Sequence, residues 1–219
     1  MADERTRAGE RYATADLVAW LDALHVEHDG ALREAFEAPD RHGIPAIQLG
    51  RSDAKTVYLL LRLIGARRVV EIGTLVGYST LWLARATGPE GRVWTLEIEP
   101  RHAELARAHL AAAGCADRVE VLVGPALERL PRLESHGPFD AVFIDADKGN
   151  YDAYGRWAAR HVRPGGLLIA DNAHYFGKLL DPDSAEAAAM RRFHQEAAAS
   201  FDTVCIPTPD GLLAGIRRG

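Results

Sequence analysis

Two carboxylates and an amine stand together at the end of a predicted buried strand. The segment "FDAVFIDADKGNYDAY" opens with a mostly apolar run and then presents Asp145, Asp147 and Lys148. Charged groups are costly at the end of a buried strand unless something binds there. Lys148 lies three residues after Asp145, so both can face one pocket. A nearby divalent cation would disfavour the ammonium form of Lys148 and make it a plausible base. The alternative is a solvent-exposed surface lysine.

A second polar pair, Asp171 and Asn172, follows the strand predicted from "LLIAD". With Asp145, the pair offers three oxygen ligands from the ends of two neighbouring strands. Hard oxygen donors without His or Cys predict Mg²⁺, Mn²⁺ or Ca²⁺ rather than zinc. The alternative is that Asp171 and Asn172 only cap a turn, which these residue types do well.

The loop in "VVEIGTLVGYST" places Gly73 and Gly77 between a strand and a helix that begins near Tyr78. The spacing does not fit the G-x-G-x-x-G dinucleotide fingerprint, which argues against a nicotinamide cofactor. Gly73 can still let a ligand approach the backbone, and Ser79 can donate near the helix N-terminus. A plain tight turn is the alternative.

The second predicted strand ends in "TLEIE", where Glu97 stands 24 residues after Gly73. An acid at about that offset can accept hydrogen bonds from ribose hydroxyls. Glu99 competes for this role, but its place before Pro100 is typical of a helix N-cap. The glycine loop and Glu97 together predict an adenosine-bearing ligand.

These residues require a sheet that brings strand ends together. Apolar runs alternate with helical segments, which predicts an α/β fold with a Rossmann-like, doubly wound sheet that binds ligands at the carboxyl ends of its strands. Two last strands, joined by a turn at Pro209–Gly211, must be antiparallel and make the sheet mixed at one edge. The predicted strands cover 68–73, 92–99, 119–124, 139–145, 167–171, 202–208 and 212–218.

Helical patterns fill the rest of the chain. Pro100 and Gly114 bound one helix, and the spacing of Asp183 and Glu186 predicts a capping box at the start of another. The first 67 residues also have a helical pattern, and residues 1–45 form an N-terminal helical segment. Leu17, Leu21 and Leu24 recur there at helical spacing, and we expect this stripe to pack into the core.

Length and composition limit the class of protein. A chain of 219 residues fits a single domain over residues 1–219. The net charge of -5 argues against nucleic acid or an anionic membrane as a partner. The charged N-terminus lacks the apolar region of a secretion signal, and no apolar run reaches the roughly 20 residues of a membrane span. The only cysteines, Cys115 and Cys205, lack metal-type spacing. We expect a cytoplasmic protein.

Several segments, in order, resemble those of the cation-dependent, S-adenosylmethionine-using O-methyltransferases, among them the caffeoyl-CoA and catechol O-methyltransferases. They are "EIGTLVGYS", "LEIEP", "GPALERLP", "FIDADKGNY", "GGLLIADN" and "PTPDGLL". The resemblance implies a seven-stranded sheet, a homodimer and a small phenolic acceptor. It also implies that Asp145, Asp171 and Asn172 hold the cation, and that Lys148 acts on the phenol beside Asp147. Tyr175 and Phe176 belong to a loop that shapes the acceptor pocket in this family. The residues implied around the cofactor are Leu49, Glu71, Gly73, Ser79, Glu97, Ala126, Asp145 and Asp147.

The expected reaction methylates one hydroxyl of a vicinal dihydroxy aromatic compound of catechol or caffeoyl type. Ionising a phenol of pKa about 10 at pH 7 costs roughly 4 kcal/mol, and a bound cation lowers that cost. Two adjacent open positions on Mg²⁺ can accept both oxygens of a diol. The alternatives are a metal-independent small-molecule methyltransferase and a catalytically inactive adenosine-binding module.

Overall fold

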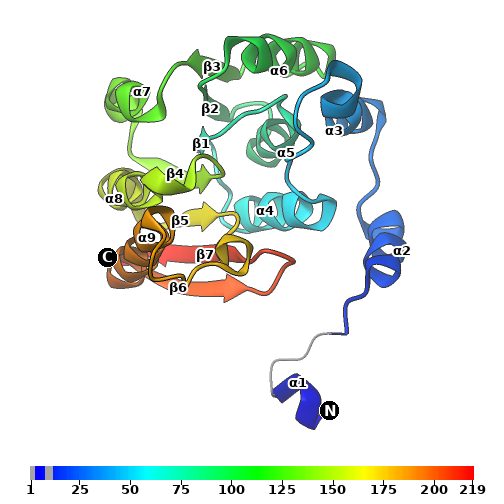
Figure 1. Cartoon of the computed structure of the whole chain (residues 1–219). Coiled ribbons are helices and arrows are strands. Elements are labelled where there is room, and N and C mark those ends of the chain that lie inside the picture. The colour runs from blue at the N-terminus through cyan, green and yellow to red at the C-terminus, as the bar shows by residue number, and fades with distance from the viewer. Residues whose placement is uncertain (1–2, 8–11) are drawn as a thin grey trace.

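One mixed sheet of seven strands organises the computed structural model, which describes residues 3–7 and 12–219 (Figure 1). The strand order is β3-β2-β1-β4-β5-β7-β6. Strands β1 to β5 are parallel, whereas β7 is antiparallel to both of its neighbours, β5 and β6. The predicted doubly wound mixed sheet is therefore confirmed. The strands are β1 (Arg68–Ile72), β2 (Arg92–Glu97), β3 (Val119–Val123), β4 (Phe139–Ile144), β5 (Val162–Ala170), β6 (Phe201–Ile206) and β7 (Leu212–Arg217).

Helices precede the sheet and connect its strands. Within the described ranges, none of them combines the length and apolar composition that a membrane crossing requires. The α-helices are α1 (Glu4–Arg7), α2 (Ala15–His25), α3 (Gly30–His42), α4 (Arg51–Leu63), α5 (Tyr78–Thr87), α6 (Pro100–Ala112), α7 (Ala126–Leu133), α8 (Tyr151–His161) and α9 (Ala185–Ser200). Short 3-10 turns are η1 (Glu134–His136), η2 (Lys148–Asn150) and η3 (Tyr175–Gly177).

The sheet is buried on both faces. Alternate residues of a strand point to opposite sides, so that Val69 of β1 belongs to one apolar cluster and Val70 to the other. Residues of α3, α4, α5 and α6 complete the first cluster, and residues of α7, α8 and α9 complete the second, as the two groups of helices in Figure 1 suggest. Burial on both faces explains the continuous apolar runs, and it leaves the carboxyl ends of the strands as the place for a ligand.

Strand β5 begins five residues earlier than predicted. Val162 pairs with Phe139 before a shift of register, which draws the segment "RPGG" into the strand. A Cβ at Gly166 would lie 2.6 Å from the carbonyl oxygen of Asp140. The glycine thus permits a close approach to β4 that the pattern of turn-forming residues did not reveal.

The caps of two helices test the sequence patterns. Glu99 caps α6, where its carboxylate accepts a hydrogen bond from the Arg101 amide at 3.4 Å, as predicted. The N-cap of α9 is Ser184 rather than Asp183, so the predicted capping box was wrong by one residue. Ser184 prevails because its hydroxyl accepts from the amide of Ala187, three residues on.

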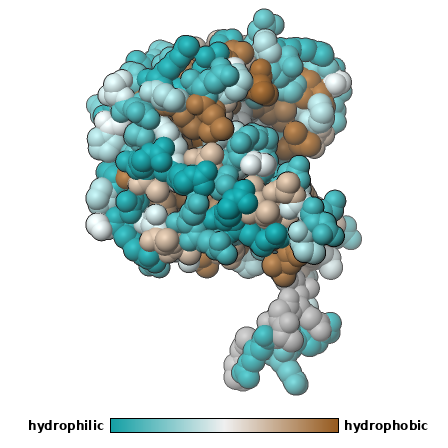
Figure 2. All heavy atoms as spheres, turned by 60° about the vertical axis from the view of Figure 1, so that its left-hand side comes forward, coloured by the Kyte–Doolittle hydropathy of each residue, from teal (hydrophilic) through white to brown (hydrophobic). Residues whose placement is uncertain are grey.

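Helix α2 does not pack as expected. None of its residues, all of which the structure describes, is buried. The stripe of Leu17, Leu21 and Leu24 is 42%, 38% and 61% exposed, and Trp20 beside it is 63% exposed. The expectation of core packing was therefore wrong, because helical spacing identifies an apolar face without saying what covers it. Figure 1 shows α2 beside the body of the protein, and Figure 2 shows a largely hydrophilic face with separate apolar clusters.

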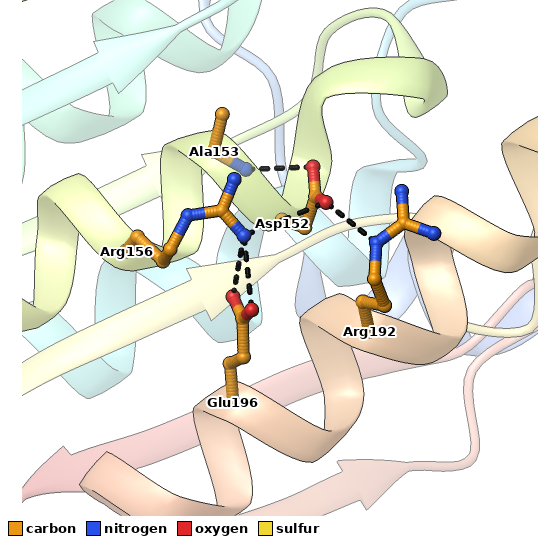
Figure 3. Close-up of polar contacts among 5 residues, drawn as sticks. All are labelled: Asp152, Ala153, Arg156, Arg192 and Glu196. Atoms are coloured by element: carbon orange, nitrogen blue, oxygen red, sulfur yellow. Dashed lines mark hydrogen bonds and ion pairs between the residues drawn. The ribbon is translucent and has the colours of Figure 1, made fainter.

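Ion pairs join α8 to α9 beside the second apolar cluster (Figure 3). Arg192 of α9 donates to Asp152 of α8 at 2.9 Å. In the reverse direction, Arg156 of α8 donates to both carboxylate oxygens of Glu196, at 2.9 and 3.0 Å. Asp152 is buried, so its pairing with Arg192 compensates the loss of water and fixes the first turn of α8.

Candidate active site

The loop between β1 and α5 depends on glycine. Gly73 has a φ of 102°, and a Cβ there would lie 2.0 Å from the carbonyl oxygen of Asp145. The ends of β1 and β4 can therefore approach only because residue 73 lacks a side chain. Gly77, with a φ of 88°, directly precedes α5, and Ser79 lies in the first turn of that helix. The loop keeps the strand ends and the helix N-terminus together at one wall of a cavity.

Glu71 supports this loop from behind. It is fully buried in β1 and accepts hydrogen bonds from the hydroxyls of Ser79 (2.6 Å), Thr80 (2.5 Å) and Thr95 (2.6 Å). Burial raises the pKa of Glu71 to about 7, although these three hydroxyls oppose the shift. Glu71 therefore lies outside the cavity lining and is linked to it through Ser79.

Glu97, at the end of β2, also holds the loop. Its Oε2 accepts from the amides of Thr74 (3.2 Å) and Leu75 (2.7 Å), and its Oε1 accepts from the amide of Glu99 (3.0 Å). Leu75 needs this support because its φ of 49° is unusual for a leucine. Glu97 thus both shapes the glycine loop and lines the cavity.

The ends of β1, β4 and β5 are joined in series. The amide of Asp145 donates to Ile72 at 2.8 Å, and the amide of Asp171 donates to Ile144 at 2.9 Å. Burial raises the pKa of Asp145, against the effect of Lys148. Burial first, and then the charge of Asp145, raise the pKa of Asp171 to about 7. The two acids therefore resist ionisation together, and a nearby positive charge would relieve both.

This donor set fits a divalent cation. Asp145, Asp171 and Asn172 all line the cavity and offer carboxylate and amide oxygens, which Mg²⁺ and Ca²⁺ prefer. Across residues 3–7 and 12–219, no group of three His, Cys, Asp or Glu side chains is arranged to hold a metal. Beside the carboxylates of Asp145 and Asp171, the side-chain amide of Asn172 offers a further oxygen donor in the cavity lining. Asn172 has a φ of 53°, a conformation that asparagine tolerates better than most residues.

Lys148 and Asp147 flank the acids at the start of η2. The Lys148 Nζ atom lies 3.3 Å from Asp145 Oδ1 and donates to the Tyr151 hydroxyl at 2.7 Å. Asp147 accepts from the Tyr154 hydroxyl at 2.6 Å and from the Asn150 side chain at 2.5 Å. The side chain of Lys148 is only 14% exposed, so the interpretation of a surface lysine does not hold.

A cavity of about 940 Å³ collects most of the predicted residues. Two predicted residues are not in its lining: Glu71, described above, and Tyr175, which is half-buried and packs against the second apolar cluster. The predicted residues that line the cavity are Leu49, Gly73, Ser79, Glu97, Ala126, Asp145, Asp147, Lys148, Asp171, Asn172 and Phe176.

The cavity wall also contains titratable residues that were not predicted, among them Asp53, Tyr154 and Asp210. Burial first, and then the charge of Asp22, raise the pKa of Asp53 in α4 to about 6. Asp210 comes from the turn between β6 and β7, and its Oδ1 accepts from the Phe176 amide at 2.8 Å. Tyr154 and Asp210 had usable signals, since Tyr154 lies one helical turn beyond Tyr151 and Asp210 belongs to the motif "PTPDGLL".

Comparisons with known proteins agree with this geometry. The family model described as O-methyltransferase matches residues 23–218. A catechol O-methyltransferase of Mycobacterium tuberculosis is 52% identical over 178 residues, which are 81% of this chain and 80% of that protein. A caffeoyl-CoA O-methyltransferase 2 of Zea mays is 33% identical over 83% of this chain and 74% of its own length.

A solved structure is similar over the whole chain. The O-methyltransferase TomG from Streptomyces achromogenes, described as involved in tomaymycin synthesis and in complex with SAM, superimposes with a TM-score of 0.89. It is 37% identical and is covered in full, as is this chain.

Proposed function

The chain belongs to the O-methyltransferase family, and from this premise we propose that it methylates one hydroxyl of a vicinal dihydroxy aromatic compound. We propose S-adenosylmethionine as the methyl donor, a divalent cation as a second requirement, and one domain that carries both sites. The observation that carries the proposal is the meeting of Asp145, Asp171, Asn172 and Lys148 in the wall of a cavity that also contains Glu97.

The glycine loop and the end of β2 suit the adenosine half of the donor. Glu97 faces the cavity and can accept a hydrogen bond from a ribose hydroxyl. Gly73 leaves the backbone accessible, while Ser79 stands in the first turn of α5, where amides are unpaired. Ala126 and Leu49 add apolar contacts at the wall. Bound S-adenosylmethionine would supply an electrophilic methyl group beside Asp145 and Asp147.

The acids at the ends of β4 and β5 suit the acceptor. A divalent cation held by Asp145, Asp171 and Asn172 would supply a Lewis acid that lowers the cost of ionising a phenol. Lys148 would then take the phenol proton on Nζ, and the adjacent carboxylate of Asp145 would favour the charged amine that results. Phe176, at the mouth of the cavity, offers an apolar surface to an aromatic ring. The preference for a diol is supported by relatives named catechol O-methyltransferase.

The test compares a catechol with its monohydroxy analogue, each with Mg²⁺ and with EDTA. We expect methyl transfer to the diol with Mg²⁺, its loss with EDTA, and its return on adding Mg²⁺ or Mn²⁺. Full activity in EDTA would instead support a metal-independent methyltransferase. Tight binding of S-adenosylmethionine without turnover of any diol would support an inactive binding module.

We also propose a homodimer. The apolar residues of α2, Leu17, Trp20, Leu21 and Leu24, are exposed in the single chain, and a contiguous apolar face of this kind is typical of an interaction surface. A second copy of the chain would cover it. Light scattering should give about twice the 23.9 kDa mass of one chain, and a mass of one chain at micromolar concentration would contradict the proposal.

A further inference from the structure

We infer that Tyr151 is a positioning residue for Lys148, and that its hydroxyl aims the lysine amine at the acceptor. The inference rests on the proposed role of Lys148 as the base. It concerns a residue that lies outside the cavity lining and would not itself touch the substrate.

The Tyr151 hydroxyl stands between the base and the two strand ends. It accepts a hydrogen bond from Lys148 Nζ at 2.7 Å, and it lies 3.1 Å from the Asp171 carbonyl oxygen and 3.4 Å from that of Ile144. A tyrosine hydroxyl has one proton to donate. Because the contact with the Asp171 carbonyl oxygen is the shorter of the two, the hydroxyl donates its hydrogen bond there. An oxygen lone pair of Tyr151 is then directed at Lys148.

The position of the hydroxyl is fixed by its surroundings. Tyr151 is fully buried, and its ring packs against Phe193 of α9 in an edge-to-face arrangement with centroids 5.4 Å apart. The next residue, Asp152, is tied to α9 by Arg192 (Figure 3). Tyr151 is therefore held by α9 on one side and by a strand-end carbonyl on the other, so it cannot follow a moving lysine.

This rigid acceptor limits the orientations of the amine. Nζ is directed at Asp145 on one side and at Tyr151 on another, and it also lies 4.7 Å from the centroid of the Tyr151 ring. Lys148 is part of the cavity wall, so the remaining bonding direction of Nζ faces the cavity. A lysine has a flexible four-carbon stem, and without the hydroxyl Nζ would sample other directions. Small losses of alignment of this kind lower the rate of proton transfer without changing binding.

The first test is Tyr151→Phe, which keeps the ring and its packing but removes the hydroxyl. We expect kcat to fall about 10- to 100-fold, because a misplacement of about 1 Å can cost about 100-fold, whereas losing a general base altogether costs about 10²–10⁴-fold. The KM for the diol and the Kd for S-adenosylmethionine should change less than about twofold, within ordinary scatter between independent sites. An unchanged kcat in a folded variant would overturn the inference.

A second replacement distinguishes two effects of removing the hydroxyl: the loss of the acceptor for Lys148 and the loss of the donor to the Asp171 carbonyl oxygen. Tyr151 replaced by 4-aminophenylalanine keeps a donor for the Asp171 carbonyl but offers Lys148 only a weak acceptor. It should lower kcat as Tyr151→Phe does, and it provides the same readout should Tyr151→Phe prove unstable. Near-normal kcat in this variant would show that only the carbonyl needed the hydroxyl.

A double-mutant cycle with Lys148→Met supplies the decisive readout. If Tyr151 acts through Lys148, then Tyr151→Phe should have almost no effect on kcat when the lysine is absent. Phe193→Leu loosens the ring packing that fixes the Tyr151 hydroxyl, so any loss of kcat that it causes should also disappear in the Lys148→Met background. Equal, multiplicative effects of Tyr151→Phe in both backgrounds would reduce Tyr151 to a structural residue. A Lys148→Met enzyme with normal kcat would instead refute the role of the lysine.

Discussion

Replacing Glu97 with alanine should lower the affinity for S-adenosylmethionine and the stability of the unliganded protein together. The structure gives the carboxylate two tasks. It lines the cavity, and it accepts from the backbone amides of Thr74, Leu75 and Glu99.

The first magnitude follows from the remaining acceptor capacity of Glu97. A carboxylate has about four lone-pair directions, and three of them are filled by the backbone amides. About one is left for a ribose hydroxyl, rather than the two that a bidentate contact would need. A single hydrogen bond to a charged group contributes about 1.5–3 kcal/mol, so Kd should rise about 10- to 150-fold.

The second magnitude concerns the loop. Removing the carboxylate leaves the amides of Thr74 and Leu75 without their acceptor, and Leu75 then loses the contact that supports its positive φ. Because water from the cavity can reach part of this loop, we expect the cost of about one unsatisfied amide, about 1–3 kcal/mol. For a chain of 219 residues, an unfolding entropy of about 2.1 cal/mol/K per residue means that this cost should lower Tm by about 2–7 °C.

Calorimetric titration with S-adenosylmethionine and a thermal melt of the unliganded protein measure the two effects. Glu104→Ala is the matched control, since it removes an exposed carboxylate of α6 outside the cavity lining and should leave the cofactor affinity nearly unchanged. A folded Glu97→Ala variant with both Kd and Tm unchanged would refute the reasoning. A change in Tm alone would retain Glu97 as a loop support and remove it from the ribose site.

Three other substitutions test separate parts of the site. Lys148→Ala should lower kcat by about 10²–10⁴ while cofactor affinity measured by calorimetry stays constant, and near-normal kcat would exclude it as the base. Asp171→Ala should abolish the Mg²⁺ dependence and most of the turnover of a catechol while sparing cofactor binding; undiminished Mg²⁺-dependent turnover would exclude Asp171 as a ligand. Burial raises the pKa of Glu71 from an ordinary 4.5 to about 7, so between these two pH values the folded state holds a proton that the unfolded state has lost. The free energy of unfolding should therefore decrease as the pH rises from 4.5 to about 7. Glu71→Gln should remove this dependence of stability on pH, which amounts to about 3 kcal/mol at most. Thermal melts at pH 5 and pH 8 measure it, and an equal change of Tm between the two pH values in both proteins would contradict the assignment.

Local sequence patterns are sufficient to predict the strands of the sheet and the polar residues at their carboxyl ends. Runs such as "RVVEI" and "FDAVFI" predict strands that are buried on both faces. Such a strand has no face toward water, so its sequence does not alternate between apolar and polar residues. Because parallel strands bind ligands at their carboxyl ends, the same pattern predicts that Asp145 and Asp171 lie close together there. The resemblance of the motifs added the methyl donor and the cation to that prediction.

Tertiary structure determines which of the predicted residues line the cavity. Glu71 and Ser79 both belong to the same motif, yet Glu71 is buried behind the loop and Ser79 lines the cavity. Asp53 and Asp210 enter the wall from distant parts of the chain, and no local pattern marks them. The side on which a residue lies depends on the packing of segments far apart in sequence, which spacing does not encode.

Helix α2 and Tyr151 show that a local sequence pattern does not predict which distant segments a side chain contacts. The apolar stripe of α2 predicts burial, but among residues 3–7 and 12–219 no other segment buries it. Tyr151 has the type and spacing of an ordinary core residue, but the fold brings its hydroxyl to Lys148 and to the end of β5. The periodicity of apolar residues indicates which side of a helix or strand the hydrophobic effect favours burying. The hydrophobic effect is non-directional, so the periodicity does not specify a partner. The partners that satisfy this preference, and the hydrogen bonds formed on the way, are set only when distant elements meet.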